Sequence, residues 1–178
     1  MPGISRARVL GAITALGAAG PLAFGAATSA TGTKIDPADI VLLNGLLASA
    51  QAGLDLYNGA VRAKILSAPV ALATTQFAND HAAHRDLLSA AITAGGGVPV
   101  PEAPAAVVDP STAEATFLGG ALSFERQTAT LYLAAIPALK NRELTKTAAS
   151  ILGVITAHVA LLAEALRQDP AFPTSFVT

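Results

Sequence analysis

Residues 80–84 have the sequence Asp-His-Ala-Ala-His and hold two of the three histidines in this 178-residue chain, the third being His158. His81 and His84 share the spacing of one helix face with the apolar residues Phe77, Leu88 and Ile92. Side chains three, four and seven residues apart lie on the same side of an α-helix, and an apolar stripe of this kind faces a protein core. The sequence therefore predicts a long helix whose two imidazole rings point inward.

The second half of the chain repeats the pattern of the first half. A shift of 74 residues places His84 on His158, and a shift of 75 residues places the stripe within 43–61 on the stripe within 118–136. Each half then contains two helices joined by a short loop, which makes them antiparallel neighbours. We predict an all-α protein made of two helical hairpins.

Capping and turn residues mark the limits of the four predicted helices. Aspartate or asparagine accepts hydrogen bonds from free amides at a helix start, proline fits the first turn, and glycine ends a helix. The predicted starts are Asp36-Pro37, Pro69, Asp109-Pro110 and Asn141, and the predicted ends of the first two helices are near Leu66 and at Gly95-Gly96-Gly97. Residues 95–108 then form a connection long enough to run the length of a bundle.

The first thirty residues are expected to be a leader that precedes the fold. Arg6 and Arg8 form a short basic start, residues 9–26 are apolar and uncharged, and residues 27–30 have small side chains where a signal peptidase could cut. We therefore predict a signal peptide over residues 1–30. The alternative is an uncleaved leader that stays in a bilayer as an anchor.

Composition excludes several classes of function. The chain has no cysteine, which rules out disulfides, thiolate metal sites and thiol nucleophiles. It has 11 basic and 12 acidic residues, and removal of a leader containing two arginines and no acid leaves 9 − 12 = −3, so a nucleic-acid partner is not expected. The sequence also has no phosphate-binding glycine loop and no serine-nucleophile motif. The tail, residues 169–178, contains two prolines and is predicted to be irregular.

Over residues 36–168 the chain resembles the ferritin-like superfamily, specifically its small exported bacterial ferritin-like domain proteins. The residues that carry the resemblance are Leu43-Asn44, Tyr57, His84-Arg85, Phe124-Glu125-Arg126, Tyr132 and Ala157-His158. The resemblance implies a ferritin-like four-helix bundle of two helical hairpins joined by a long crossover. It also implies that the first helix lies beside the third, with Ala50 facing Glu125.

The resemblance further implies where metal ligands would lie. In metal-binding members the first and third helices each supply a glutamate, and the second and fourth each supply Glu-x-x-His, which together hold two irons. In this chain the ligand positions that remain are Glu125, His84 and His158, and the positions that differ are Ala50, His81 and Ile155. We expect a degenerate di-iron site, because two cations a few ångströms apart need bridging carboxylates that are missing here.

Two interpretations of the remaining polar residues stay open. His81, His84, Glu125 and His158 could bind a single transition-metal ion, with iron or zinc expected from such ligands. Alternatively, they form a metal-free hydrogen-bonded cluster inside the core, because buried polar groups normally satisfy one another.

The sequence favours a non-enzymatic function with no catalytic residues, in which the protein has a structural, protective or binding role. Its expected location is the cell envelope, either periplasmic or extracellular. The alternative is a metal-binding protein or metal-dependent oxidoreductase. No permanent membrane span is expected after cleavage. Glycines predicted on outer helix faces could allow a homodimer, namely Gly45, Gly53, Gly59, Gly119 and Gly120. Tyr57 and Tyr132 are predicted to be core residues with satisfied hydroxyls, and Asp80 and Asp86 to lie on a solvated helix face.

Overall fold

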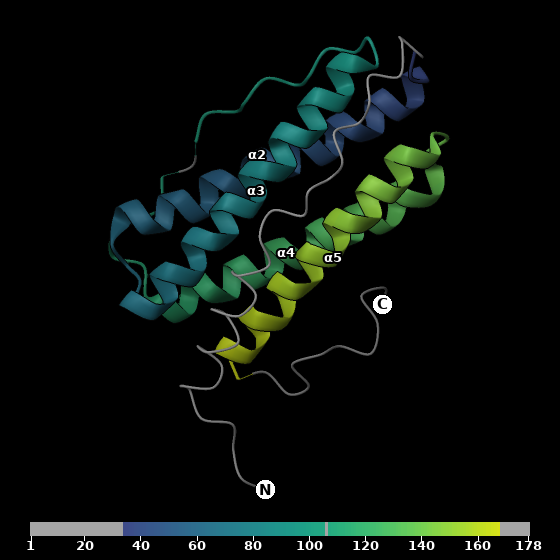
Figure 1. The fold of residues 1–178 in the computed structure, drawn as a ribbon. Helices are drawn as coiled ribbons and strands as arrows, with labels where there is room; N and C mark the ends of the chain where they lie inside the picture. Colours follow the sequence, from purple (N-terminus) through teal and green to yellow (C-terminus); the bar gives the residue numbers. More distant parts are fainter. Residues whose placement is uncertain (1–33, 106, 168–178) are drawn as a thin grey trace, which may run out of the picture.

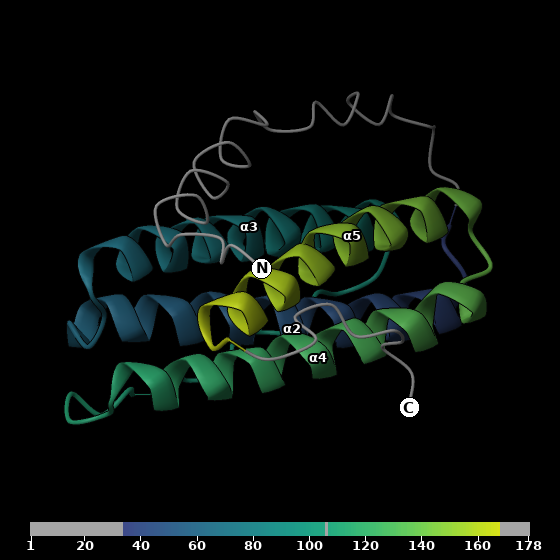
Figure 2. The same ribbon diagram turned by 90° about the horizontal axis from the view of Figure 1, so that it is seen from below.

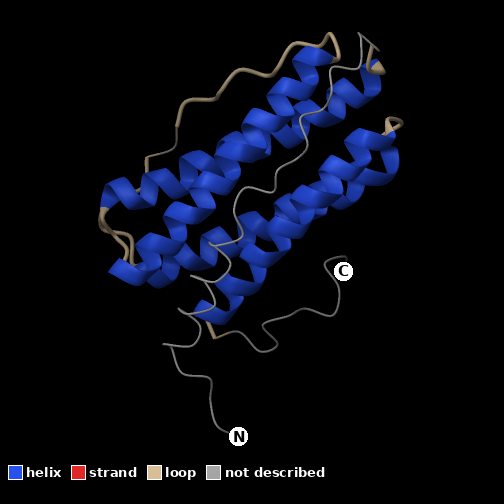
Figure 3. Ribbon diagram, viewed as in Figure 1, coloured by secondary structure: helices blue, strands red, loops and turns tan. Residues whose placement is uncertain are grey.

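The computed structural model describes residues 34–105 and 107–167, so the predicted signal peptide at 1–30 and tail at 169–178 lie outside the described residues. The described residues form four α-helices and no strand (Figure 3). The helices are α2 (Pro37–Ala63), α3 (Ala68–Ala94), α4 (Glu114–Ala138) and α5 (Arg142–Ala165). The prediction of an all-α fold with four long helices is confirmed.

Side-chain caps start α2 and α5 where the sequence predicted. The carboxylate of Asp36 accepts a hydrogen bond from the amide of Ala38, with Pro37 in the first turn. Asn141 accepts hydrogen bonds from the amides of Glu143 and Leu144. These bonds satisfy amides that have no partner within the helix, which is why the two helices begin at these residues.

The predicted start of the third helix at Asp109-Pro110 is wrong, because α4 begins at Glu114. The side chain of Asp109 accepts hydrogen bonds from both the amide and the hydroxyl of Ser111, and its carbonyl accepts from the amide of Thr112. Aspartate followed by serine thus forms a local turn with the same residue types that cap a helix. Glu114 instead accepts a hydrogen bond from the amide of Ser67, which ties the start of α4 to the α2–α3 turn.

The four helices are arranged as two antiparallel hairpins that pack side by side. Among the described helices, α2 packs along α3 and α4 along α5, while α2 also contacts α4 and α3 contacts α5. Figure 2 shows α4 beside α2 and α5 beside α3. Helices α3 and α4, although consecutive, are therefore not a packed hairpin, as the ferritin-like arrangement requires.

The long connection between α3 and α4 runs over the bundle from one end to the other (Figure 1). The side-chain amide of Asn44 donates to the carbonyl of Val98, and its oxygen accepts from the amide of Val100. Gln51 donates to the carbonyl of Val100. Asn44 and Gln51 thus hold the first part of the crossover on α2, and the crossover prediction is confirmed.

A buried carboxylate connects two helical segments at one end of the bundle. Asp39, which is fully buried in the first turn of α2, accepts hydrogen bonds from the amides of Lys140 (2.9 Å) and Asn141 (3.0 Å). The ammonium of Lys140 also lies 2.7 Å from the carboxylate of Asp36. The start of α2 is therefore attached to the turn between α4 and α5.

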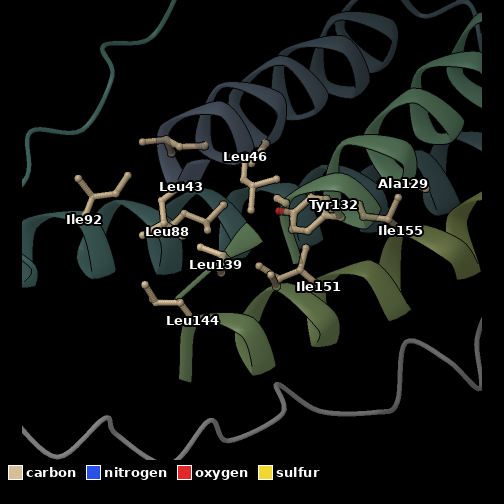
Figure 4. Close-up of a cluster of buried hydrophobic side chains, with 14 residues drawn as sticks. Leu43, Leu46, Leu88, Ile92, Ala129, Tyr132, Leu139, Leu144, Ile151 and Ile155 are labelled. Atoms are coloured by element: carbon tan, nitrogen blue, oxygen red, sulfur yellow. The ribbon is translucent and has the colours of Figure 1, made fainter. Parts of the chain in front are cut away.

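Two apolar clusters fill the interior, one toward each end of the bundle. The first cluster includes Leu43, Leu88, Tyr132 and Ile151 (Figure 4). The second cluster is built around Tyr57 with residues from all four helices. The buried histidines and Glu125 occupy helix positions between these clusters, so the core contains a polar layer.

Helices α2 and α5 are long and apolar enough, by length and composition, to cross a bilayer. Both helices also supply residues to the two apolar clusters. A core helix of a soluble bundle passes the same test of length and composition, so the test alone does not assign a membrane span.

Candidate functional site

Glu125 is the centre of the polar layer. It lies on α4 with no exposed surface, and its Oε1 accepts hydrogen bonds from the hydroxyl of Tyr57 at 2.6 Å, Nε2 of His81 at 3.0 Å and Nδ1 of His158 at 3.1 Å. Its Oε2 has no hydrogen-bond partner among residues 34–105 and 107–167. One carboxylate oxygen is thus crowded with donors, while the other is available to a further ligand.

These contacts keep the carboxylate of Glu125 in its ionised form. Burial alone would raise the pKa of Glu125, but the hydrogen bonds from His158 and His81, together with their charges, lower it to about 2. A hydrogen bond to the charged form favours that form. Glu125 is therefore an ionised carboxylate in the core at neutral pH.

His158, on α5, lies between two carboxylates. Its Nδ1 contacts Oε1 of Glu125, and its Nε2 lies 3.1 Å from Oδ2 of Asp80. Burial lowers the pKa of His158, but the hydrogen bonds to Asp80 and Glu125, and the charges of both carboxylates, reverse this effect and raise it. Because ionised carboxylates only accept hydrogen bonds, both ring nitrogens donate, and His158 is an imidazolium in this arrangement.

The prediction that Asp80 lies on a solvated helix face is wrong. Its side chain is 30% exposed, and it accepts hydrogen bonds from Gln76 and His158. Asp80 immediately precedes His81, which places it at the edge of the apolar stripe, and an aspartate there is usually solvated. Asp86, in contrast, is 69% exposed, as predicted, and pairs with Arg85.

His81 and His84 both lie on α3 but have different environments. The ring of His81 stacks on Tyr57 with centroids 5.6 Å apart, and its Nε2 reaches Glu125. The ring of His84 meets that of His81 edge-on at 5.9 Å. Burial, followed by the charges on His81 and His158, lowers the pKa of His84 to about 4. Within the described chain, Nδ1 of each ring has no hydrogen-bond partner.

Three of the four predicted site residues lie together. Ligand atoms of His81, Glu125 and His158 all lie within 4.8 Å of one another, and all three side chains are buried. His84 adjoins this group but is outside it. Sequence reasoning did not assign Asp80 or Tyr57 to the site, and no spacing signal distinguishes either from a surface or core residue.

Tyr57 is a core residue with a satisfied hydroxyl, as predicted. Its ring contacts Phe77 and Phe117 edge-on, and its hydroxyl donates to Glu125. Burial, then the charge of Glu125 and the hydrogen bond to it, raise the pKa of Tyr57. The hydroxyl therefore stays protonated and remains a donor to Oε1.

Two ligand positions of the metal-binding members are apolar in this chain. Ala50 and Ile155 are 3% and 1% exposed and belong to the first apolar cluster. Gln51, beside Ala50, is engaged with the crossover through Val100. Among described residues near the polar layer, the buried carboxylate is Glu125, with Asp80 at its edge.

Comparison with protein families identifies the family to which this bundle belongs. The family model described as a ferritin-like domain matches residues 38–168, which cover all four helices except Pro37 at the start of α2. A search of curated proteins found no significant match. The match agrees with the two packed hairpins, the crossover and the polar layer at mid-bundle, and the chain belongs to the ferritin-like domain family.

Proposed function

We propose that this protein is an exported ferritin-like bundle that binds a single divalent transition-metal ion through His81, Glu125 and His158, in a binding rather than a catalytic role. The observation that carries the proposal is the proximity of one ligand atom from each residue, all within 4.8 Å of one another inside the core. Oε2 of Glu125 supports it, because a buried carboxylate oxygen without a partner is costly.

The donor set suits zinc or iron. Two imidazoles and one carboxylate bind zinc in several enzymes, and the same set binds iron(II) in others. Asp80 supports the metal site by accepting a hydrogen bond from Nε2–H of His158. A histidine that binds a metal through one ring nitrogen usually donates the N–H of the other to a carboxylate or carbonyl. With Nε2–H held by Asp80, Nδ1 of His158 is the nitrogen that would bind the ion after losing its proton.

The residues do not fit two irons. Three of the four glutamate positions of the metal-binding members hold other buried residues, namely Ala50, His81 and Ile155, so the bridging carboxylates of a dinuclear centre have no counterpart. One buried carboxylate cannot offset the repulsion between two divalent cations. We therefore regard the site as a degenerate di-iron site that retains capacity for one ion.

A second candidate is a metal-free bundle with a structural or protective role in the envelope. The contact of His81 with Glu125 favours it, because a neutral ring that donates from Nε2–H to Glu125 leaves only an acceptor unsatisfied at Nδ1. Metal binding through Nε2 would move this proton to Nδ1, where a buried donor lacks a partner. Buried unsatisfied donors cost free energy, which opposes metal binding.

Metal analysis tests the proposal directly. Mature protein purified without a tag or chelator should contain, or take up on reconstitution with iron, zinc, copper or manganese, about one equivalent of ion. Glu125→Gln and His158→Ala should abolish uptake. Less than about a tenth of an equivalent with every metal would reject the metal site, and about two equivalents of iron would reject the mononuclear assignment. Rapid oxidation of added iron(II) by the loaded protein would reject the non-catalytic role.

A further inference from the structure

The prediction that Gly53 lies on an outer helix face is wrong, because Gly53 is buried on α2 directly against the imidazole ring of His81. A β-carbon built at Gly53 would lie 2.5 Å from both Cε1 and Nδ1 of His81 and 2.7 Å from its Cγ. Contacts this short essentially never occur at real β-carbons. Any residue other than glycine at this position would therefore force the ring or the helix to move.

The ring of His81 is held on its other sides. It is 1% exposed, stacks on Tyr57, and lies 5.9 Å from the ring of Phe124. Its Nε2 contacts Oε1 of Glu125 at 3.0 Å. Since close-packed interiors have few voids, the ring can retreat from a β-carbon only by giving up some of these contacts.

The internal repeat offers a comparison within the same chain. The shifts of 75 and 74 residues place Gly53 on Thr128 and His81 on Ile155. The position that holds the His81 ring in the first hairpin thus faces a glycine on the neighbouring helix, whereas the equivalent Ile155 in the second hairpin has a threonine there. Glycine is unfavourable in a helix interior relative to alanine. At Gly53, unlike Gly45 on the same helix, the short contacts of a built β-carbon show that the space is needed.

We infer that Gly53 is a positioning residue for His81: the bare backbone of α2 accommodates the Nδ1 edge of the ring and thereby directs Nε2 onto Glu125. Nδ1 has no hydrogen-bond partner within the described residues, so steric fit on that side decides which edge of the ring faces the cluster. The consequence for metal binding rests on the proposed function, whereas the consequence for the orientation of the ring does not.

The test compares Gly53→Ala with Gly45→Ala, which lies on the same helix and has open space around its added β-carbon. Long-range ¹H–¹⁵N correlation spectra of the metal-free protein report the tautomer and hydrogen bonding of each imidazole. Gly53→Ala should shift the His81 signals and weaken zinc binding by at least about tenfold, the range found when the support of a ligand is lost. Gly45→Ala should leave both measurements unchanged.

The two proposals fail in different ways. If the wild type takes up none of the four metals, the metal site is rejected, and the His81 signals still test the role of Gly53. Unchanged His81 signals in folded Gly53→Ala would overturn the inference. If Gly53→Ala does not fold, the double variant Gly53→Ala/His81→Ala decides: removal of the ring should restore folding, and a double variant that remains unfolded would overturn the inference as well.

Discussion

Nε2 of His158 lies 3.1 Å from Oδ2 of Asp80, and this contact connects the buried polar layer to a side chain that is 30% exposed. The pair fixes the orientation of the His158 ring, so that Nδ1 faces Glu125. A partly buried carboxylate thereby determines which nitrogen of His158 faces the core. The relationship makes Asp80 part of the site, although it is outside the group of closest ligand atoms.

Asp80→Asn should weaken zinc binding by about 10- to 100-fold, because the amide oxygen can still accept Nε2–H but the charge that supports the imidazole is lost. Titration with zinc against a competing chelator measures the change. Asp86→Asn, on the same helix and paired with Arg85 at the surface, is the matched control and should bind zinc as the wild type does. Equal affinity in both variants would remove Asp80 from the site.

Glu125→Leu should lower the free energy of unfolding of the metal-free protein by about 3–5 kcal/mol, because it leaves the His158 imidazolium and two further donors without their acceptor. Glu125→Gln keeps an acceptor oxygen and should cost less, about 1 kcal/mol. Urea unfolding of both variants measures the difference. A Leu variant as stable as the Gln variant would show that the hydrogen bonds to Oε1 contribute nothing net.

Stability should fall steeply in acid. The pKa of Glu125 is about 2 in the folded protein against 4.5 ordinarily, so its contribution is present above pH 4.5 and is lost as the pH falls toward 2. The pKa of His84 is about 4 against 6.5, so the folded state takes up its proton later than the unfolded chain, and stability falls from pH 6.5 toward 4. Each shift corresponds to about 3 kcal/mol at full effect.

The contribution of His158 to stability changes with pH in the opposite direction. Its pKa is raised in the folded protein, so its contribution is present below pH 6.5 and is lost as the pH rises through the raised value. Free energies of unfolding measured across the pH range separate these contributions. His84→Leu should flatten the slope between pH 4 and 6.5 and leave the slope below pH 4; an unaltered profile would contradict the assignment to His84.

Asp39→Asn should destabilise the bundle by about 1–3 kcal/mol, because the amide group can accept only one of the two backbone N–H groups of Lys140 and Asn141. Thermal unfolding measures the change. Asp36→Asn, three residues earlier, is the control: asparagine caps a helix as well as aspartate, and the exposed pair with Lys140 contributes little. Similar losses in both variants would argue against the buried attachment at Asp39.

Export should remove about the first 27 to 30 residues in the native host, because the run of small residues ends there. Intact-mass measurement of the mature protein determines the cleavage point. Detection of Met1 or Pro2 on protein extracted from membranes would instead favour a retained anchor.

The sequence predicted the fold well because its main signals are periodic and doubled. Each half of the chain has two apolar stripes, and the repeat of this pattern in the second half predicts four helices. The length of the connection at residues 95–108 predicts the crossover. Capping was predicted correctly at Asp36 and Asn141 but not at Asp109, because an aspartate followed by serine also stabilises a turn.

The site was predicted less completely, because its contacts depend on rotamers and on pairing between helices. Helical spacing placed His81, Glu125 and His158 on inward faces, and the structure brings them together. Spacing could not show that His84, one turn after His81, lies beside this group and not within it. It also could not show that Asp80 turns from the edge of the stripe toward another helix.

Each hairpin holds only half of the polar layer. His81 and Asp80 belong to the α2–α3 hairpin, whereas Glu125 and His158 belong to the α4–α5 hairpin. An ion bound at the proposed site would therefore act as a noncovalent cross-link between the halves, and the free energy holding them together would increase with the logarithm of the free ion concentration above its dissociation constant. Separation of the hairpins would release the ion, which makes the opening of the bundle a route for metal exchange.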